Sequence, residues 1–214
     1  MMQRAKSRPT VPHDVAAGDG GAREPGWWRR VWQRLMPPPS AELVLAQLNR
    51  QLALLEKART ELQVGWVQGG WWTVSSSDGS PRLVTGYAPA AAGGSPGHVD
   101  GVCLVGALVR ARSHRPDARS DVGRAVDAVY DALWASRGQP RAPLPGGLPP
   151  VPPPDVRLAR VRTLTQWNDQ AGRTRAEVLA VVDRAISATI MDLMSAPRPA
   201  PAEPAGAPAG ARTG

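Results

Sequence analysis

Proline- and glycine-rich segments divide this chain of 214 residues and limit where a folded core can form. Proline and glycine contribute 23 and 22 residues, and they cluster in residues 1–39, in residues 140–154 and after residue 196. Segments of this kind bury too little apolar surface to offset the entropy that is lost when they become ordered. We therefore expect one folded domain between disordered tails rich in Pro, Gly and Ala.

The division predicts four segments. Residues 1–26 are predicted to be a disordered leader, and residues 27–39 a short basic amphipathic segment with Trp and Arg. Residues 40–195 are expected to form a single helical domain, which an inserted Pro-rich loop at 139–155 interrupts. Residues 196–214 are predicted to form the disordered tail.

Apolar residues at helical spacing predict a mainly α domain of about four helices with one short β-hairpin. Ser40 is a good N-cap for the first helix, and Gly65 fits the left-handed position just past its end. Residues 102–109 are apolar on nearly every side, which favours a buried helix. Gly106 lowers the helix propensity there, so we expect another backbone to approach it closely.

Two further helices are predicted from their capping residues. Ser120 and Asp121 can cap a helix that ends near Trp134. Thr174 and Glu177 have the spacing of a capping box, and apolar residues follow at helical spacing as far as residue 193.

The predicted hairpin consists of two short strands around a turn. Residues 71–74 and 82–85 are rich in strand-forming side chains, and Asp78-Gly79 between them suits a tight turn. A short segment, residues 156–165, is expected to lead from the Pro-rich loop into the last motif.

The motif at residues 167–177 is the most diagnostic stretch of the chain. In the structural interpretation, Trp167 anchors a loop in the core, Arg173 pairs with a carboxylate, and the Asn-Asp pair satisfies backbone groups. Its functional interpretation makes Asp169 and Arg173 a polar site at a helix N-terminus, where anions bind readily. We favour the structural interpretation. The motif residues are Trp167, Asn168, Asp169, Arg173, Thr174 and Glu177.

The segment at 27–39 is the best candidate for an intermolecular contact. Four apolar residues at helical spacing, Trp28, Val31, Trp32 and Leu35, fall on one face of a short helix, and its Arg residues fall elsewhere. It either folds back onto the domain, or binds a groove of a partner protein or an anionic membrane surface. The candidate contact residues are Trp27, Trp28, Arg29, Arg30, Trp32 and Arg34.

Nothing in the sequence points to a catalytic centre, a metal site or a cofactor. Cys103 is the only cysteine, and we expect it to be a buried core residue in a cytoplasmic protein. The three histidines share no metal-ligand spacing. Asp127 and Asp131, one helical turn apart, are expected to face solvent beside Arg124.

The net charge of +8 suggests a polyanionic partner, but much of the positive charge lies outside the predicted domain. Residues 1–39 contain seven Lys/Arg and three Asp/Glu, whereas residues 40–195 contain seventeen and fourteen. The domain is therefore nearly balanced. A row of Arg from 110 to 119 can contact phosphates, but Asp117 interrupts it, and a solvated surface is favoured.

Three features in order carry a resemblance to a known family. Gly65-Trp66 follows a Leu-rich helix, Cys103 begins a C-x-x-G-A-L helix, and the motif from Trp167 completes a W-N-D…G-R-T-x-x-E-V pattern. Over roughly residues 43–190 the chain resembles a family of small proteins of unknown function from GC-rich bacteria. The resemblance implies a shared fold and no assigned activity. The leader and the Pro-rich insertion lie outside the pattern.

Three functions stay open at this point. We favour a non-enzymatic accessory or protein-interaction module with an unknown protein partner. The second is a nucleic-acid-associated protein that binds through an Arg-rich surface and the leader. The third is a small enzyme with a polar site around Asp169 and Arg173, assisted by Cys103.

Overall fold

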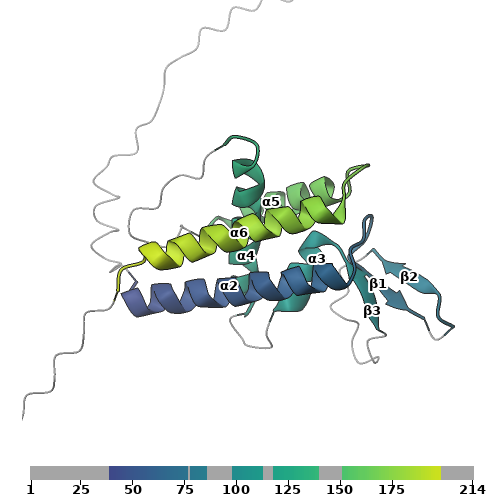
Figure 1. Ribbon diagram of the computed structural model, residues 1–214, viewed down its shortest axis with the longest axis horizontal. Helices are drawn as coiled ribbons and strands as arrows, with labels where there is room; N and C mark the ends of the chain where they lie inside the picture. The colour runs from purple at the N-terminus through teal and green to yellow at the C-terminus, as the bar shows by residue number, and fades with distance from the viewer. Residues whose placement is uncertain (1–38, 77, 86–97, 113–117, 140–150, 199–214) are drawn as a thin grey trace, which may run out of the picture. The chain divides into compact units, whose positions relative to one another are not determined.

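The computed structural model describes residues 39–76, 78–85, 98–112, 118–139 and 151–198. Within them lie five helices and three strands, so the predicted mainly α fold is confirmed (Figure 1). The helices are α2 (Ala41–Val64), α3 (Leu104–Ala111), α4 (Ala118–Ala135), α5 (Pro154–Asn168) and α6 (Arg175–Ser195), and the strands are β1 (Trp72–Ser75), β2 (Pro81–Val84) and β3 (Val99–Val102).

Several predictions fall outside the described residues. These are the leader at 1–26, nearly all of the Trp/Arg segment at 27–39, most of the Pro-rich loop at 139–155 and nearly all of the tail at 196–214.

The long helices α2 and α6 lie side by side and run antiparallel (Figure 1). Ser40 caps α2 as predicted, because its hydroxyl accepts a hydrogen bond from the Leu43 N–H at 3.3 Å. A buried hydrogen bond of 3.0 Å joins Gln51 Nε2 to the Thr189 hydroxyl. Nearer the other end of the pair, Arg59 and Asp183 form a surface ion pair at 2.5 Å. The antiparallel pairing places the end of α2 beside the start of α6.

The sheet has three antiparallel strands in the order β2-β1-β3, one more than the predicted hairpin. The third strand ends at Val102, which the sequence had assigned to a buried helix. Helix α3 begins two residues later, at Leu104, with Cys103 as its N-cap. The prediction of a helix from 102 was therefore wrong at its start, because Val102 pairs with Trp72 in the sheet.

Two glycines allow backbones to approach closely. A Cβ atom on Gly106 would collide with the carbonyl oxygen of Trp71, so the predicted approach of another backbone is confirmed. Gly65 ends α2 with φ −167°, which is extended rather than left-handed, and that prediction was wrong. Position 65 requires glycine because a Cβ atom there would collide with the carbonyl oxygen of Asp100.

Helix α5 was predicted only as a short segment within 156–165, preceded by a loop that reached residue 155. It spans fifteen residues and begins at Pro154, which occupies its first turn, where a missing N–H costs nothing. Its Val156 and Leu158 side chains are largely exposed. The weak apolar face of α5 explains why hydrophobic periodicity did not reveal its full length.

Charged residues join α5 to α4. Asp127 is buried rather than facing solvent as predicted, and it accepts from Arg157 at 2.8 Å and from Arg160 at 2.9 Å. The Arg160 guanidinium also lies 4.9 Å from the centroid of the Tyr130 ring. Two arginines one turn apart on α5 thus hold one carboxylate of α4, and they supplement the apolar contacts that α5 makes through Leu164 and Trp167.

Helix α4 also begins earlier than predicted. Ser120 and Asp121 lie inside it rather than at its cap. The Asp121 carboxylate is buried and lies 3.5 Å from Arg50 of α2.

Candidate functional site

Asn168, the last residue of α5, joins three separate parts of the fold. Its side-chain oxygen accepts from the Trp66 indole N–H at 2.8 Å and from the Leu104 backbone N–H at 3.2 Å. Its side-chain nitrogen donates to the Val67 carbonyl at 3.1 Å and to Asp169 at 2.8 Å. The residue is fully buried, and all four of its side-chain hydrogen bonds end on protein atoms. Its role in this position is structural.

Asp169 caps a turn that follows α2. Its Oδ1 atom accepts from the Gly69 backbone N–H at 3.0 Å as well as from Asn168. Gln68 completes the junction, since its side-chain nitrogen donates to the carbonyls of Asn168 and Gln170 at 2.8 and 3.0 Å. Sequence reasoning missed Gln68, because nothing local signals a partner a hundred residues away.

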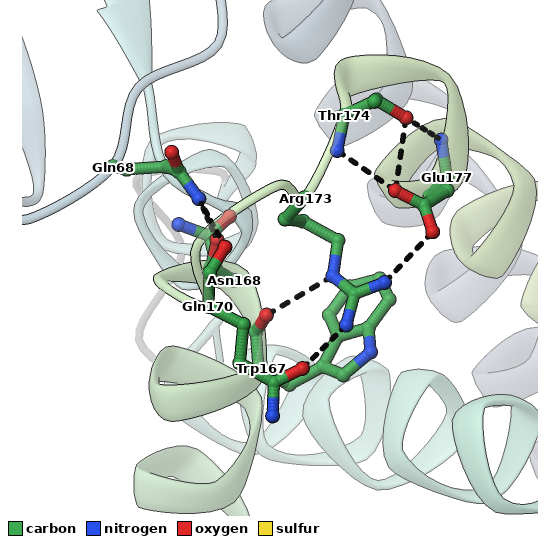
Figure 2. Close-up of polar contacts among 7 residues, drawn as sticks. All are labelled: Gln68, Trp167, Asn168, Gln170, Arg173, Thr174 and Glu177. Carbon is green, nitrogen blue, oxygen red and sulfur yellow. Dashed lines mark hydrogen bonds and ion pairs between the residues drawn. The ribbon is translucent and has the colours of Figure 1, made fainter.

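Arg173 lies between α5 and α6 and holds both (Figure 2). Its Nε donates to the Trp167 carbonyl at 3.2 Å, and its two terminal nitrogens donate to Glu177 at 2.9 Å and to Gln170 at 2.5 Å. The predicted pairing of Arg173 with a carboxylate is confirmed, and its charge is largely balanced by Glu177.

The predicted capping box at the start of α6 is present. The Thr174 hydroxyl accepts from the Glu177 N–H at 3.3 Å, and the Glu177 carboxylate accepts from the Thr174 N–H at 2.8 Å. The hydrogen bond from the Thr174 backbone N–H is the main reason why the pKa of Glu177 lies below its usual value.

Cys103 lies in the core, as predicted. Its sulfur accepts from the Gly106 N–H at 3.2 Å, and burial raises the pKa of the thiol. A protonated, buried thiol is a poor nucleophile.

A pocket of about 290 Å³ opens beside the motif, between the end of α4 and the first turns of α6. Arg173 and Glu177 form part of its wall, and Trp167 with Leu133 and Val181 gives it an apolar side. Neither Asp169 nor Cys103 lines it. The lining residues are Leu133, Ser136, Arg137, Trp167, Arg173, Glu177, Ala180, Val181 and Arg184.

Arg137 and Arg184 are the cations of this pocket that lack a carboxylate partner among the described residues. Both are exposed, and neither has a described Asp or Glu within 4.0 Å. The Arg137 guanidinium lies 5.0 Å from the centroid of the Trp134 ring, a contact that orients the side chain without neutralising it. Since Glu177 balances Arg173, the wall carries two positive charges that no described carboxylate neutralises.

The remaining sequence candidates are placed as follows. The Trp/Arg residues from Trp27 to Arg34 lie outside the described residues. Arg110, the first of the basic row, pairs with Glu61 of α2 at 3.1 Å. In the described ranges, no three His, Cys, Asp or Glu side chains gather in a way that would hold a metal ion.

Each helix in the described ranges is too short or too polar to cross a bilayer.

Comparison with known proteins gives one match. A model of a family of unknown function, DUF6197, matches residues 47–188, which include α3, the Asn168 junction and the whole pocket wall. Neither the curated proteins nor the solved structures include a match. The sequence had suggested a family of unknown function over roughly residues 43–190, and the match confirms this resemblance. Because the matched region covers most of the chain, the protein belongs to the DUF6197 family of unknown function.

Proposed function

We propose that this domain is a non-enzymatic binding module that receives an anionic group of its partner in the pocket between α4 and α6. One observation carries the proposal: Arg137 and Arg184 line one pocket and have no carboxylate partner among the described residues. Guanidinium groups that are not already paired are good ligands for carboxylates and phosphates.

The motif beside the pocket supports binding rather than catalysis. Asn168 and Asp169 are occupied in joining α5 to the turn after α2, and Cys103 is buried away from the pocket wall. The three side chains of the enzyme hypothesis therefore do not share this pocket. Arg173 alone lines it, and it is held by three acceptors.

The shape of the wall suggests how a ligand would lie. The charged group of a ligand can reach the two arginines, while Leu133, Val181 and Trp167, which are almost completely buried, offer its organic body little apolar area. The volume of about 290 Å³ is at the small end for ligand pockets, so it suits one terminal group of a larger partner or a small molecule. We place this activity in the cytoplasm, as the lone cysteine led us to expect.

The proposal is tested by titrating the full chain with benzenesulfonate and phenyl phosphate at low ionic strength. Binding is followed by NMR through the Nε–H signals of the arginines. We expect the signals of Arg137 and Arg184 to shift. Arg137→Gln and Arg184→Gln should each weaken binding by about fivefold, the size expected for a partly exposed ion pair.

The matched control is Arg162→Gln, which removes an exposed arginine of α5 that does not line the pocket. This variant should bind both probes as the unmodified protein does. If neither probe binds, or if all three variants weaken binding equally, the anion-binding module is excluded.

The Trp/Arg segment at 27–39 supports a separate proposal from the sequence alone: contact with a partner protein or an anionic membrane surface. Deletion of residues 1–38 followed by sedimentation with anionic vesicles tests the membrane form. Absence of vesicle binding by the full chain rejects it.

A further inference from the structure

We infer that the pocket between α4 and α6 is selective for a dianionic head group of the phosphomonoester type. This inference rests on the proposed function and names the chemical class of the ligand. The evidence for this selectivity is the set of charges that face the pocket, and the capped N-terminus of α6 has no part in it.

The charge count of the wall is the first argument. Four charged side chains line the pocket, and two of them, Arg173 and Glu177, neutralise each other through a bond of 2.9 Å. Arg137 and Arg184 remain, with a net charge of two. A monoanion would leave one guanidinium without a counter-charge, whereas a dianion balances both.

The state of Glu177 is the second argument. Its carboxylate oxygens are occupied by Arg173 on one side and by the Thr174 backbone and hydroxyl on the other. It therefore stays ionised as part of the wall and does not act as a free negative charge that would repel the ligand. The same bonds hold Arg173 in place, so this part of the wall is ordered before a ligand arrives.

The location of the two arginines is the third argument. They come from different helices, Arg137 from the turn after α4 and Arg184 from the third turn of α6, and they line the same small pocket. A phosphomonoester places both charges and three acceptor oxygens on one tetrahedral group, so one head group can accept from both arginines. In a dicarboxylate the two charges are separated by the carbon chain.

The burial of the apolar lining residues is the fourth argument. Leu133, Val181 and Trp167 line the pocket but are almost completely buried, and the Arg173 guanidinium lies over the Trp167 ring, so the charged head group rather than its organic body makes most of the contact. A phosphorylated side chain of a partner protein and a small phosphomonoester have this chemistry in common. A phosphotyrosine peptide and phenyl phosphate separate the two sources, because the peptide binds more tightly only if residues around the head group add contacts.

The test compares phenyl phosphate with benzenesulfonate at pH 5 and pH 8, again with the full chain. A phosphomonoester gains its second charge near pH 6, whereas the sulfonate stays a monoanion throughout. The charged groups that face the pocket are Arg137, Arg173, Arg184 and Glu177, and none of these is expected to change its charge between the two pH values.

We expect the affinity for phenyl phosphate to rise about fivefold from pH 5 to pH 8, which corresponds to one added ion pair. The affinity for benzenesulfonate should not change. In Arg184→Gln the rise should disappear, and in the control Arg162→Gln it should remain. Unfolding curves of the variants establish that each is folded.

The outcomes separate the two ideas. Equal binding of both probes at both pH values overturns the selectivity for a dianion and leaves the anion-binding module intact. A phthalate dianion that binds as tightly as phenyl phosphate also overturns the phosphomonoester assignment. Absence of binding by every probe removes the module itself.

Discussion

The guanidinium carbon of Arg173 lies 4.3 Å from the centroid of the Trp167 ring, and the same side chain donates to the Trp167 carbonyl oxygen. One residue thus fixes both the backbone and the indole of the last turn of α5. A lysine has neither a planar group to stack nor several fixed donors, so it cannot reproduce these contacts. The link between α5 and α6 depends on this arrangement, and the wall of the pocket depends on it as well.

Substitution of Asn168 by Ala should be the most costly change in the motif. It leaves the buried Leu104 N–H and the partly buried Trp66 indole and Val67 carbonyl without their partner. Each buried unsatisfied group costs about 1–3 kcal/mol, so we expect a loss of about 3 kcal/mol or more in unfolding free energy. Urea unfolding measures it, with the exposed Gln166→Ala as control. A loss below about 1 kcal/mol would contradict the structural role of Asn168.

Asp169→Ala distinguishes the two interpretations of the motif. The substitution removes the acceptor of the Gly69 N–H and of the Asn168 amide, and should cost about 1 kcal/mol of stability. Binding of phenyl phosphate should stay the same, since Asp169 does not line the pocket. Both quantities are measured on one preparation by urea unfolding and NMR titration. Unchanged stability with altered binding would reverse our assignment.

Gly106→Ala is expected to destabilise the domain even though alanine favours helices. The added Cβ would collide with the backbone carbonyl of Trp71, and overpacking of this kind costs about 1–3 kcal/mol. The control is Gly123→Ala in α4, where the added atom meets the guanidinium of Arg157 rather than backbone. Thermal unfolding should show a larger loss for Gly106→Ala, and the opposite order would refute the close backbone approach.

The charged junction between α4 and α5 gives a prediction for a double-mutant cycle. Asp127→Ala leaves Arg157 and Arg160 without their shared carboxylate, and we expect a loss of about 2 kcal/mol. Adding Arg160→Ala to this variant should cost less than Arg160→Ala alone, because the Asp127 carboxylate is already gone and only the contacts of Arg160 with Tyr130 and Asp131 remain. Chemical denaturation of the four proteins gives the coupling energy. Strict additivity would show that the ion pair does not hold α5.

The capping box predicts that the stability of the domain depends on pH through the ionisation of Glu177. The pKa of Glu177 is lower in the folded protein than its ordinary value of 4.5, chiefly through the Thr174 N–H. A lowered folded-state pKa stabilises the protein above the unfolded pKa, and this stabilisation is lost as the pH falls through the folded-state pKa. Glu177→Gln should therefore flatten the decline in melting temperature below about pH 4.5. The exposed Glu56→Gln on α2 serves as control, and identical acid profiles of Glu177→Gln and the unmodified protein would argue against the cap.

Local signals in the sequence predicted the two longest helices well. Ser40 and the Thr174–Glu177 pair are caps that act within three residues, and the apolar spacing after each cap is regular. Gly106 was also assigned correctly, because a glycine inside an apolar helix has few explanations other than close packing. In each case the evidence lies within one turn of the residue.

The errors come from long-range partners. Strand β3 has only four residues, two of which are Asp100 and Gly101, so nothing local marks it as a strand. Helix α5 buries Leu164 and Trp167 near its end, but its first half is held by the carboxylate of Asp127. The sequence did not predict the pocket because Arg137 and Arg184 are far apart in the chain. Nothing in the sequence around an exposed arginine indicates whether a second arginine lies close to it in space.

The buried amide of Asn168 also constrains the order of folding. Its partners Trp66 and Leu104 precede it by 102 and 64 residues, so their N–H groups remain unpaired until nearly all of the domain has left the ribosome. The contacts of Arg173, Thr174 and Glu177 span at most six residues and close without that delay. The turn between α5 and α6 can therefore form as an early local unit, and closure of the core around Asn168 is a late step.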